Sequence, residues 1–415
     1  MIATPLSANS GSTDMFSLLG PEFLADPYSF YSSLYKSGPV QWVPGVFGMG
    51  AWVVTSHPSC VEVLRSKIFG KEGEKVLLVE KMARIEQENA ALLERRRGNM
   101  LYRDPPDHTR LRSLVSLAFT PRTVEKLGPK ISRITDSLLD AMAGSREADL
   151  IQDFAFPLPI IVIAELLGVP PEERQRFKSW STDITLGASP VATAEDQKKN
   201  ISAGRELDEY MRQIVELRRA TPQADLISDL VRAQEQGSRL SMNELLATCR
   251  VLLTAGHETT VNLIGNGMLA LFRHPSQRAE LAADPSLLPN AVEELLRYDS
   301  PLQLTLRFAF EDTQLEGQTI KRGELLVLLL GGANRDPAQF AEPDQLELRR
   351  KNASTHLSFG QGIHYCLGAS LARLEGELAI GALLRRFPDM KLATPELKWR
   401  RNITLRGLQS LKVCL

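Results

Sequence analysis

The chain has 415 residues, of which 43% are apolar and 24% charged, a balance typical of a water-soluble globular protein with a sizeable core. Its 49 basic and 50 acidic residues nearly cancel, which argues against nucleic acid or an anionic membrane as the main partner. The length alone allows two domains, but proline and glycine are spread along the chain and no linker stands out. We therefore predict one mainly α-helical domain over residues 1–415 with a small β-rich part, and we expect a monomer.

No segment is typical of targeting to, or crossing of, a membrane. Residues 1–20 are small and polar, lack the order of a signal peptide, and are expected to be a flexible N-terminus. The most apolar stretch, Phe154 to Val169, contains two prolines and an acid and is too short to cross a bilayer. Four cysteines lie far apart without a CxxC pair: Cys60, Cys249, Cys366 and Cys414. The pattern excludes a disulfide framework and a sequence-local zinc site, and we expect a cytoplasmic protein.

In chain order, the first predicted element is a strand at Ala51–Thr55. Apolar residues at three- and four-residue spacing predict helices over Pro121–Met142 and Ala203–Arg219. The charged stretch Gly70–Asn99 and the small, polar stretch Gly187–Asn200 look like loops or lids. For both stretches, a solvated surface segment and a substrate-gating element stay open as alternatives.

A long helix is predicted from Ser241 to His274. Ser241 and Glu244 have the spacing of a capping box, and Pro275 stops the helix. Such a helix would be roughly 50 Å long at about 1.5 Å per residue, enough to cross a whole domain. Its centre is apolar nearly all round, so we expect it to be buried.

Polar residues interrupt the apolar centre of this helix at positions 255–260. A charged Glu258 in a buried helix is costly unless it is solvated or paired. Gly256 is a poor helix residue, but it would let a flat cofactor and oxygen approach the backbone closely. Thr259 can hydrogen-bond back to the Ala255 carbonyl and open the helix locally. From these residues alone, a kinked core helix with a water pocket stays open beside a reactive site.

Further along, Glu294 and Arg297 place opposite charges on one helix face at i, i+3 spacing. Taken alone, such a pair is most often a solvated surface ion pair. Short apolar runs then predict strands at Leu325–Leu330 and Leu411–Leu415.

The most informative segment is the loop from Phe359 to Gly368, which contains Cys366. Its two glycines at 360 and 362 permit a tight or positive-φ backbone, and a helical pattern follows at Ala369–Arg386. The sulfur therefore lies at a predicted helix N-terminus, where unpaired N–H groups and the helix dipole lower the pKa of a thiol. A stabilised thiolate is a good iron ligand, and a buried structural thiol is the alternative.

With this loop the sequence resembles the cytochrome P-450 family, whose cysteine-loop signature is FxxGxxxCxG. Every signature position is matched, by Phe359, Gly362, Cys366 and Gly368. The resemblance is strongest to soluble bacterial members that act on polyketides, macrolides and fatty acyl chains, and its motifs run from about Asp26 to the C-terminus. It implies the cytochrome P-450 fold, with a large helical haem domain and a small β-rich portion. It also implies haem b as the cofactor, with Cys366 as its axial iron ligand.

The resemblance assigns roles to the other motifs. Residues 255–259 match [A/G]-G-x-[D/E]-T, which implies Glu258 as the proton-relay acid and Thr259 as the alcohol that acts with it. The residues implied in haem binding are His108, Arg112, Ala255, Gly256, Arg307, Phe359, His364, Cys366 and Gly368.

Glu294 and Arg297 match the family's ExxR motif, which buttresses the haem-binding core through a third basic residue. Arg350 is the candidate for that structural role, and the adjacent Arg349 is its rival.

The resemblance implies a haem-thiolate monooxygenase that inserts one atom of O2 into a substrate by hydroxylation or epoxidation. A non-catalytic haem-thiolate sensor or carrier and a peroxide-using fatty-acid peroxygenase are the alternatives. The Glu258–Thr259 pair disfavours both of them.

The chain contains no flavin or iron–sulfur segment, because no GxGxxG follows a strand and no cysteine cluster is present. Electrons are therefore expected from a ferredoxin or flavodoxin with its NAD(P)H-dependent reductase. We expect this donor to dock on the cysteine side of the haem, where Arg110 and Lys126 are candidate contacts.

The expected substrate is a medium-to-large hydrophobic molecule, preferably a polyketide or macrolide of secondary metabolism such as antibiotic biosynthesis. A fatty acid or carrier-bound fatty acyl chain is the alternative. Candidate pocket residues are Leu302 to Thr305, His257, and parts of 70–100 and 180–200. The arginines at 95–97 are candidates for anchoring a carboxylate.

Overall fold

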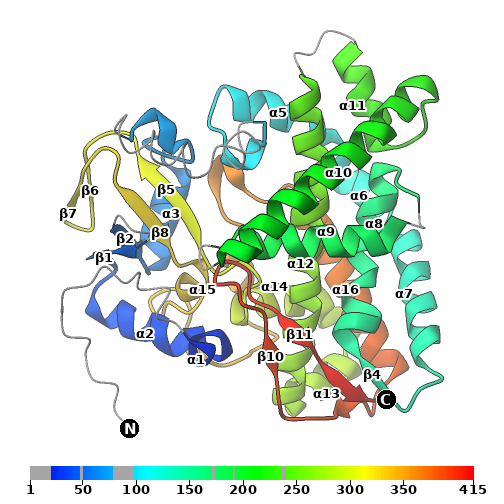
Figure 1. Cartoon of the computed structure of the whole chain (residues 1–415). Helices are drawn as coiled ribbons and strands as arrows, with labels where there is room; N and C mark the ends of the chain where they lie inside the picture. Colours follow the sequence, from blue (N-terminus) through cyan, green and yellow to red (C-terminus); the bar gives the residue numbers. More distant parts are fainter. Residues whose placement is uncertain (1–19, 47–49, 78–97, 171–172, 190–191, 236–239) are drawn as a thin grey trace.

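The computed structural model describes residues 20–46, 50–77, 98–170, 173–189, 192–235 and 240–415. The expected flexible N-terminus, most of the Gly70–Asn99 stretch and the arginines at 95–97 lie outside the described residues. The architecture is mainly helical, as predicted, with several small sheets beside the helices (Figure 1).

The helical part contains the long helices and the largest group of buried apolar side chains (Figure 1). Its main helices are α7 (Gly128–Met142), α8 (Pro157–Leu167), α9 (Arg174–Gly187), α10 (Ala194–Ala220), α11 (Leu226–Glu235), α12 (Met242–Arg273), α13 (Pro275–Ala283), α14 (Leu288–Tyr298) and α16 (Ala369–Arg386).

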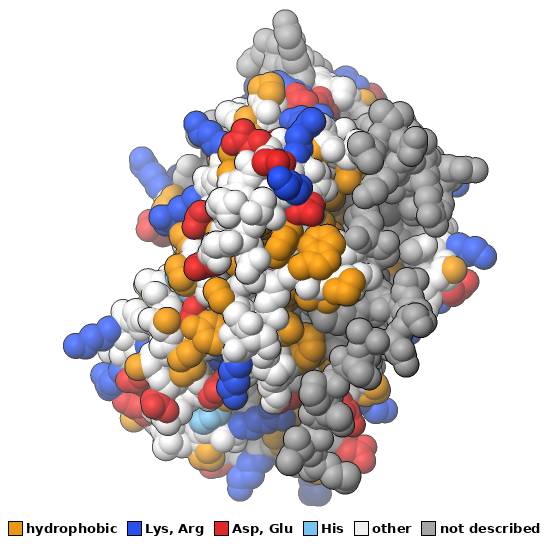
Figure 2. Space-filling view, turned by 90° about the vertical axis from the view of Figure 1, so that its left-hand side faces the viewer, with side chains coloured by type: hydrophobic (Ala, Val, Ile, Leu, Met, Phe, Trp, Pro, Cys, Tyr) orange, Lys and Arg blue, Asp and Glu red, His pale blue; other side chains and the backbone are white. Residues whose placement is uncertain are grey.

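A five-stranded sheet forms the second part, beside the N-terminal helices α1 (Pro21–Ala25), α2 (Pro27–Ser37) and α3 (His57–Arg65) (Figure 1). Only β2 and β8 pair in parallel in this sheet, which places distant segments side by side. In spatial order its strands are β1 (Val40–Val43), β2 (Ala51–Val54), β8 (Leu325–Leu328), β5 (Thr305–Ala309) and β3 (Phe69–Gly70). On the face of the molecule that Figure 2 shows, acidic and basic side chains lie next to one another, in keeping with the near-zero net charge.

The remaining strands are short, and several involve the C-terminal segment. They are β4 (Glu147–Asp149), β6 (Thr313–Leu315), β7 (Gln318–Ile320), β9 (Lys391–Leu392), β10 (Lys398–Trp399), β11 (Leu408–Ser410) and β12 (Lys412–Cys414). The β10–β11 hairpin pairs Lys398–Trp399 with Leu408–Ser410, and the loop that joins its strands lies between the sheet and the helical part, beside the N-terminal end of α10 (Figure 1).

The predicted central helix is confirmed as α12, which begins after an N-cap at Ser241. The Ser241 hydroxyl accepts from the Glu244 backbone N–H at 3.3 Å, and the Glu244 carboxylate accepts from the Ser241 N–H at 2.8 Å. This reciprocal pair satisfies two of the backbone donors that a helix start leaves free. Helix α12 packs against α8, α14 and α16, so its apolar centre lies in the core as expected.

Several predicted boundaries are wrong in detail. The segment Pro121–Met142 forms two helices, α6 (Pro121–Glu125) and α7, because Pro129 in the first turn of α7 has no N–H to continue the preceding helix. Most of Gly187–Asn200 is helical and not a loop, since Thr193 and Asp196 form a capping box that starts α10. The predicted strand Leu325–Leu330 ends at Leu328, and Leu330 begins the short helix α15 (Leu330–Ala333).

Among the described residues, Leu150–Leu167 has the length and apolar character of a membrane span, and 72% of it is buried inside the protein. It comprises a π-helical turn (Leu150–Ala155) and α8, and it packs against α12. The apolar stretch that the sequence predicts not to cross a bilayer is therefore part of the core.

Candidate active site

The cysteine loop runs from Phe359 to the start of α16 at Ala369. Gly360 and Gly362 have φ values of 66° and 69°, which side chains disfavour, and a Cβ at Gly362 would lie 2.3 Å from the Leu64 carbonyl oxygen of α3. The Cys366 N–H donates to the Phe359 carbonyl at 2.8 Å. The glycines thus close a tight loop against α3 and hold Cys366 three residues before α16.

The electrostatics of the Cys366 sulfur differ from the prediction. Burial raises the pKa of this thiol, and the Gly368 N–H and the charges of Arg112 and Arg373 lower it only in part. The helix N-terminus that the sequence emphasised is therefore outweighed by desolvation. A metal ion deprotonates a thiol that coordinates it, so the raised pKa of the free thiol is compatible with a ligand role.

A group of basic side chains, buried or half-buried, lies close to the cysteine loop. Arg112, from α5 (Asp107–Ser116), donates to the Tyr365 carbonyl at 2.8 Å. Arg307 on β5 is 3% exposed, and burial lowers its pKa to about 10. It donates to Thr305 Oγ1 at 3.3 Å and to the Leu306 carbonyl at 2.8 Å. Within the described part of the chain, neither arginine forms an ion pair with a carboxylate.

Two histidines complete this group. The rings of His108 and His364 lie 4.4 Å apart between centroids. Burial lowers the pKa of both, that of His364 to about 4, although the Asp104 carboxylate, 3.8 Å from His364 Nε2, counteracts the shift. Asp104, which the sequence analysis did not single out, also accepts the Lys71 N–H at 2.8 Å. Asp104 lies two positions after Tyr102 and directly before two prolines, and no sequence motif marks it.

This donor set fits a haem. The cofactor carries two propionates, and arginine and histidine side chains are suited to bind them as donors. Arg112 and His108 on α5, Arg307 on β5 and His364 in the cysteine loop come from three segments, yet all lie near the thiol of Cys366 or near one another. The sequence predicted these four residues, and the fold brings them together.

One turn of the otherwise buried helix α12, around Ala255, is accessible. Ala255 is exposed, Gly256 and Thr259 are partly exposed, and the helix on both sides of them lies in the core. Thr259 Oγ1 donates to the Ala255 carbonyl at 3.0 Å, as the sequence predicted. A Cβ at Gly256 would point toward α8 and lie in ordinary contact with Ile163, at 3.4 Å. Because glycine has no side chain, any cofactor contact at this position involves its backbone.

Glu258 projects from the same turn but is 2% exposed. Its carboxylate forms an ion pair with Arg400 of the β10–β11 hairpin, and its Oε2 lies 3.7 Å from His257 Nε2. The sequence analysis missed Arg400, because it is 142 residues from Glu258 and no local pattern marks it. The predicted pocket role of His257 is wrong in this structure, since its ring is fully buried against Phe156 and bonds to the Leu253 carbonyl at 2.9 Å.

The remaining predicted pocket residues divide by exposure. Gln303 and Leu304 are buried, whereas Leu302 and Thr305 are partly exposed. Of these four, Thr305 lies closest to the basic side chains near the cysteine loop, because its hydroxyl accepts hydrogen bonds from both Arg307 and Lys71.

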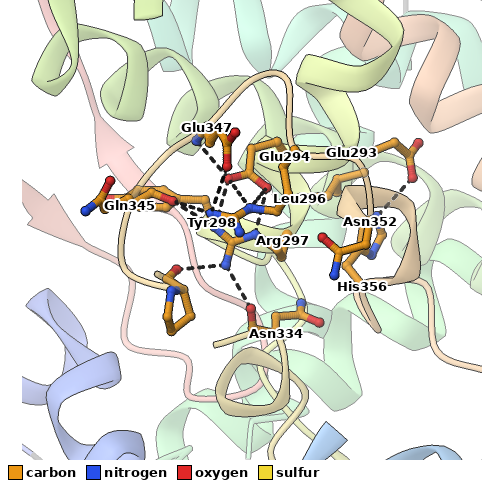
Figure 3. Close-up of polar contacts among 12 residues, drawn as sticks. Glu293, Glu294, Leu296, Arg297, Tyr298, Asn334, Gln345, Glu347, Asn352 and His356 are labelled. Atoms are coloured by element: carbon orange, nitrogen blue, oxygen red, sulfur yellow. Dashed lines mark hydrogen bonds and ion pairs between the residues drawn. The ribbon is translucent and has the colours of Figure 1, made fainter. Parts of the chain in front are cut away.

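Glu294 and Arg297 on α14 are both fully buried, unlike an ordinary surface pair. Arg297 donates twice to Glu294, at 2.7 and 2.8 Å, and its other N–H groups reach the carbonyls of Asn334, Pro343 and Gln345 (Figure 3). Arg350 Nε contacts both Glu294 oxygens at 3.1 Å.

The rival residue Arg349 is exposed and pairs instead with Glu280 and Asp284. The structure therefore groups Glu294, Arg297 and Arg350.

This α14 network connects to the cysteine loop. Asn334, whose carbonyl accepts from Arg297, also accepts the Leu357 N–H at 2.6 Å through its side chain. Ser358 Oγ donates to the Leu296 carbonyl of α14 at 2.7 Å, immediately before Phe359. The residues bonded to this network therefore hold the turn at Leu357 and Ser358 that leads into the loop.

The two predicted docking residues differ in how far their charges are compensated by acids of the same chain. Arg110 forms an ion pair with Glu244 at 2.5 Å and another with Asp107 at 3.3 Å, and both acids raise its pKa. Much of its charge is therefore compensated within the chain. Lys126 is exposed at the end of α6.

Comparisons with known proteins bear directly on this site. The Cytochrome P450 family profile matches residues 189–405. Cytochrome P450 CYP107DY1 of Priestia megaterium is 44% identical over 401 residues, which are 95% of this chain and 97% of that protein. Polyketide biosynthesis cytochrome P450 PksS of Bacillus subtilis is 42% identical over 410 residues, which are 97% of this chain and 98% of that protein.

Among solved structures, P450BioI in complex with hexadec-9Z-enoic acid ligated acyl carrier protein matches with a TM-score of 0.89 and 38% identity. The match covers 96% of this chain and 100% of that chain. Sequence and fold therefore agree with those of cytochrome P450 proteins over nearly the whole length of the chain. The chain belongs to the cytochrome P450 family and is a haem-thiolate monooxygenase.

Proposed function

We propose that this monooxygenase oxidises a medium-to-large hydrophobic substrate of the polyketide or macrolide type, by hydroxylation or epoxidation. The observation that carries the proposal is the 42% identity over almost the whole chain to PksS, whose name assigns it to polyketide biosynthesis. The accessible turn of α12 at Ala255 and Gly256, with the Thr259 hydroxyl beside it, supports a substrate that presents apolar surface with scattered oxygens.

In this proposal the haem supplies the iron centre at which dioxygen is activated. Cys366 would hold the haem iron through its sulfur, and Phe359 and Gly368 shape the loop and helix start beside it. Arg112 and Arg307 would bind the propionates together with His108 and His364, because these donors lie near the cysteine loop and neither arginine has a carboxylate ion-pair partner among the described residues.

The chain's own acid–alcohol pair handles protons. Thr259 Oγ1 lies beside the accessible face of α12, where its hydrogen bond to Ala255 can be exchanged for one to a bound molecule or water. Glu258, one residue earlier, is the buried acid that exchanges protons with the Thr259 side. This intact pair supports a catalytic protein over a sensor and over a peroxygenase.

A second candidate substrate is a fatty acyl chain carried by an acyl carrier protein. The structural match to P450BioI bound to such a ligated carrier favours it. The two candidates differ in one testable respect, because a carrier-bound substrate requires a protein partner and a free polyketide does not.

The electron donor in this proposal is a separate ferredoxin or flavodoxin with its NAD(P)H-dependent reductase, docked on the cysteine side. Lys126 is the better candidate contact, because the charge of Arg110 is paired with Glu244. The variant Lys126→Glu should raise the donor concentration that half-saturates turnover, and an unchanged requirement would contradict this contact.

The first test is the absorption spectrum of the reduced, carbon monoxide-saturated protein beside that of a Cys366→Ser variant. The wild type should show the red-shifted Soret band of a thiolate-bound ferrous carbonyl, and the variant should lose it. A wild-type spectrum without this band would overturn the ligand assignment.

Spin-state titrations should then compare macrolides, free fatty acids and the same acyl chains on an acyl carrier protein. A shift with macrolides alone supports the first candidate substrate. A shift with the carrier-bound chain alone supports the second.

A further inference from the structure

The Glu258 carboxylate meets a cation that comes from the far end of the chain. Arg400 Nη1 donates to Glu258 Oε1, and the acid is 2% exposed whereas the Arg400 side chain is 18% exposed. Glu258 Oε2 is buried and accepts no hydrogen bond from the described residues. Its nearest titratable neighbour is His257, at 3.7 Å.

His257 does not supply the positive charge. Its ring is fully buried, and burial lowers its pKa, so the imidazole is neutral at neutral pH. Arg400 is then the cation that compensates Glu258. Because an unpaired buried carboxylate is costly, this ion pair determines where the Glu258 side chain lies.

Arg400 is itself held by the hairpin. Its N–H donates to the Gly407 carbonyl at 2.9 Å, and its Nε donates to the Leu408 carbonyl at 3.2 Å. The guanidinium therefore has one end on the Leu408 carbonyl and the other on Glu258, and the Arg400 backbone is fixed to Gly407.

The loop between β10 and β11 is in turn fixed against two helices. A Cβ at Gly407 would lie 1.8 Å from Asn262 Oδ1 of α12, so only glycine permits this close approach. Asn266 of α12 donates to the Arg406 carbonyl at 3.1 Å, and Asn402 donates to the Thr185 carbonyl of α9 at 3.3 Å. The position of Arg400 thus depends on packing against both helices.

Resting on the proposed function, we propose that Arg400 is a positioning residue for proton transfer by Glu258. Arg400 holds the carboxylate on the hairpin side of α12, one residue before Thr259. Through this ion pair, the buried acid is linked to a partly exposed side chain of the hairpin. Removing Arg400 therefore impairs the step that Glu258 serves, without affecting haem binding or the cysteine ligand.

The test uses haem-containing protein in air-saturated buffer made with H2O and with D2O, with a ferredoxin and its NADPH-dependent reductase as the electron source, so that no substrate is required. The measured quantity is the rate of NADPH oxidation. Because a displaced acid loses much of its catalytic advantage, we expect Arg400→Gln to slow this oxidation by roughly 10- to 100-fold. Arg400→Lys should recover part of the rate, since it retains the charge.

Arg401→Gln is the matched control, because Arg401 is the exposed neighbour and its charge acts on Asp196. It should react like the wild type. The double variant Glu258→Gln/Arg400→Gln should be no slower than Glu258→Gln alone, because a residue that acts through Glu258 has no further effect once the acid is gone. A rate for Arg400→Gln equal to that of the control, or additive losses in the double variant, would overturn the proposal.

A second readout does not depend on reactivity. The urea midpoint of unfolding should fall for each single variant and recover in part for the double variant, because the double change leaves no buried charge unpaired. An unaltered rate of NADPH oxidation in Glu258→Gln would count against the proposed role of Glu258, whereas the urea cycle tests the ion pair by itself. Retention of the carbon monoxide spectrum in all variants shows that the haem site is intact.

Discussion

Two buried glutamates differ in how completely their carboxylates are bonded. Glu294 on α14 accepts from Arg297, from Arg350 and from the Glu347 N–H, so both of its oxygens are satisfied. Glu258 on α12 has one oxygen on Arg400 and one that accepts no hydrogen bond from the described residues. The complete network immobilises the segments leading to the cysteine loop. The incomplete one leaves a buried acceptor open to a further donor, such as a water molecule or a bound group.

The largest expected effect comes from breaking the complete network. Arg297→Ala should lower the free energy of unfolding by about 3–5 kcal/mol, because it leaves Glu294 buried without its bidentate partner. Urea unfolding followed by circular dichroism measures this loss. The control Arg349→Ala removes an exposed pair and should cost less than about 1 kcal/mol. Similar losses in both variants would contradict the distinction between buried and exposed arginines.

Glu375 extends the comparison to the α12–α16 contact, where it is 1% exposed. Burial raises the pKa of Glu375 to about 8, and the nearby Thr260 hydroxyl lowers it only in part. The folded protein therefore binds a proton that the unfolded chain releases near pH 4.5, so stability falls as pH rises from about 4.5 to 8.

Glu375→Gln mimics the protonated acid and should remove this loss, on the order of 3 kcal/mol at pH 8 relative to pH 5. The measurement is the urea midpoint at a series of pH values, with the exposed Glu396→Gln as control. A wild-type midpoint that does not fall over this range would be inconsistent with a buried, protonated Glu375.

Glu293, next to Glu294, is expected to show the opposite sign. Burial raises its pKa, but contacts with His356 and Arg373 outweigh burial and lower the pKa to about 2. Its contribution to stability is present above the unfolded value of 4.5 and is lost as pH falls from 4.5 toward 2. The Glu293→Gln variant should lack about 2 kcal/mol of the stability that the wild type loses on acidification over this range. Acid titration by fluorescence tests this, and superimposable wild-type and variant curves would refute it.

The smallest expected effect lies at the start of α12, away from both glutamates. Ser241→Ala removes the N-cap and should cost about 1 kcal/mol of stability, whereas Ser241→Asn should retain most of it. Neither variant should alter the carbon monoxide spectrum, because the cap is several turns from residues 255–259. A changed spectrum would show that the start and the centre of α12 are coupled.

The sequence predicted the elements that have local signals. The Ser241–Glu244 box and the apolar period placed α12, and the glycines around Cys366 placed the loop and the start of α16. The prediction failed where one local sequence pattern is compatible with two structures. The apolar period continues through Pro121–Met142, although Pro129 interrupts the backbone hydrogen bonds, and the small polar residues before Asn200 were assigned to a loop although they begin α10.

Only the tertiary structure decided between partners that the sequence leaves equivalent. Arg349 and Arg350 are adjacent and chemically identical, and it is the burial of Glu294 that selects Arg350. Arg400 and Asp104 contact Glu258 and His364 from distant segments, and no periodicity or spacing encodes such a contact. The sequence by itself determined the chemistry available to the site, because reactive residues stand in local motifs. The structure determined which charges are compensated, because compensation depends on burial and on neighbours brought together by folding.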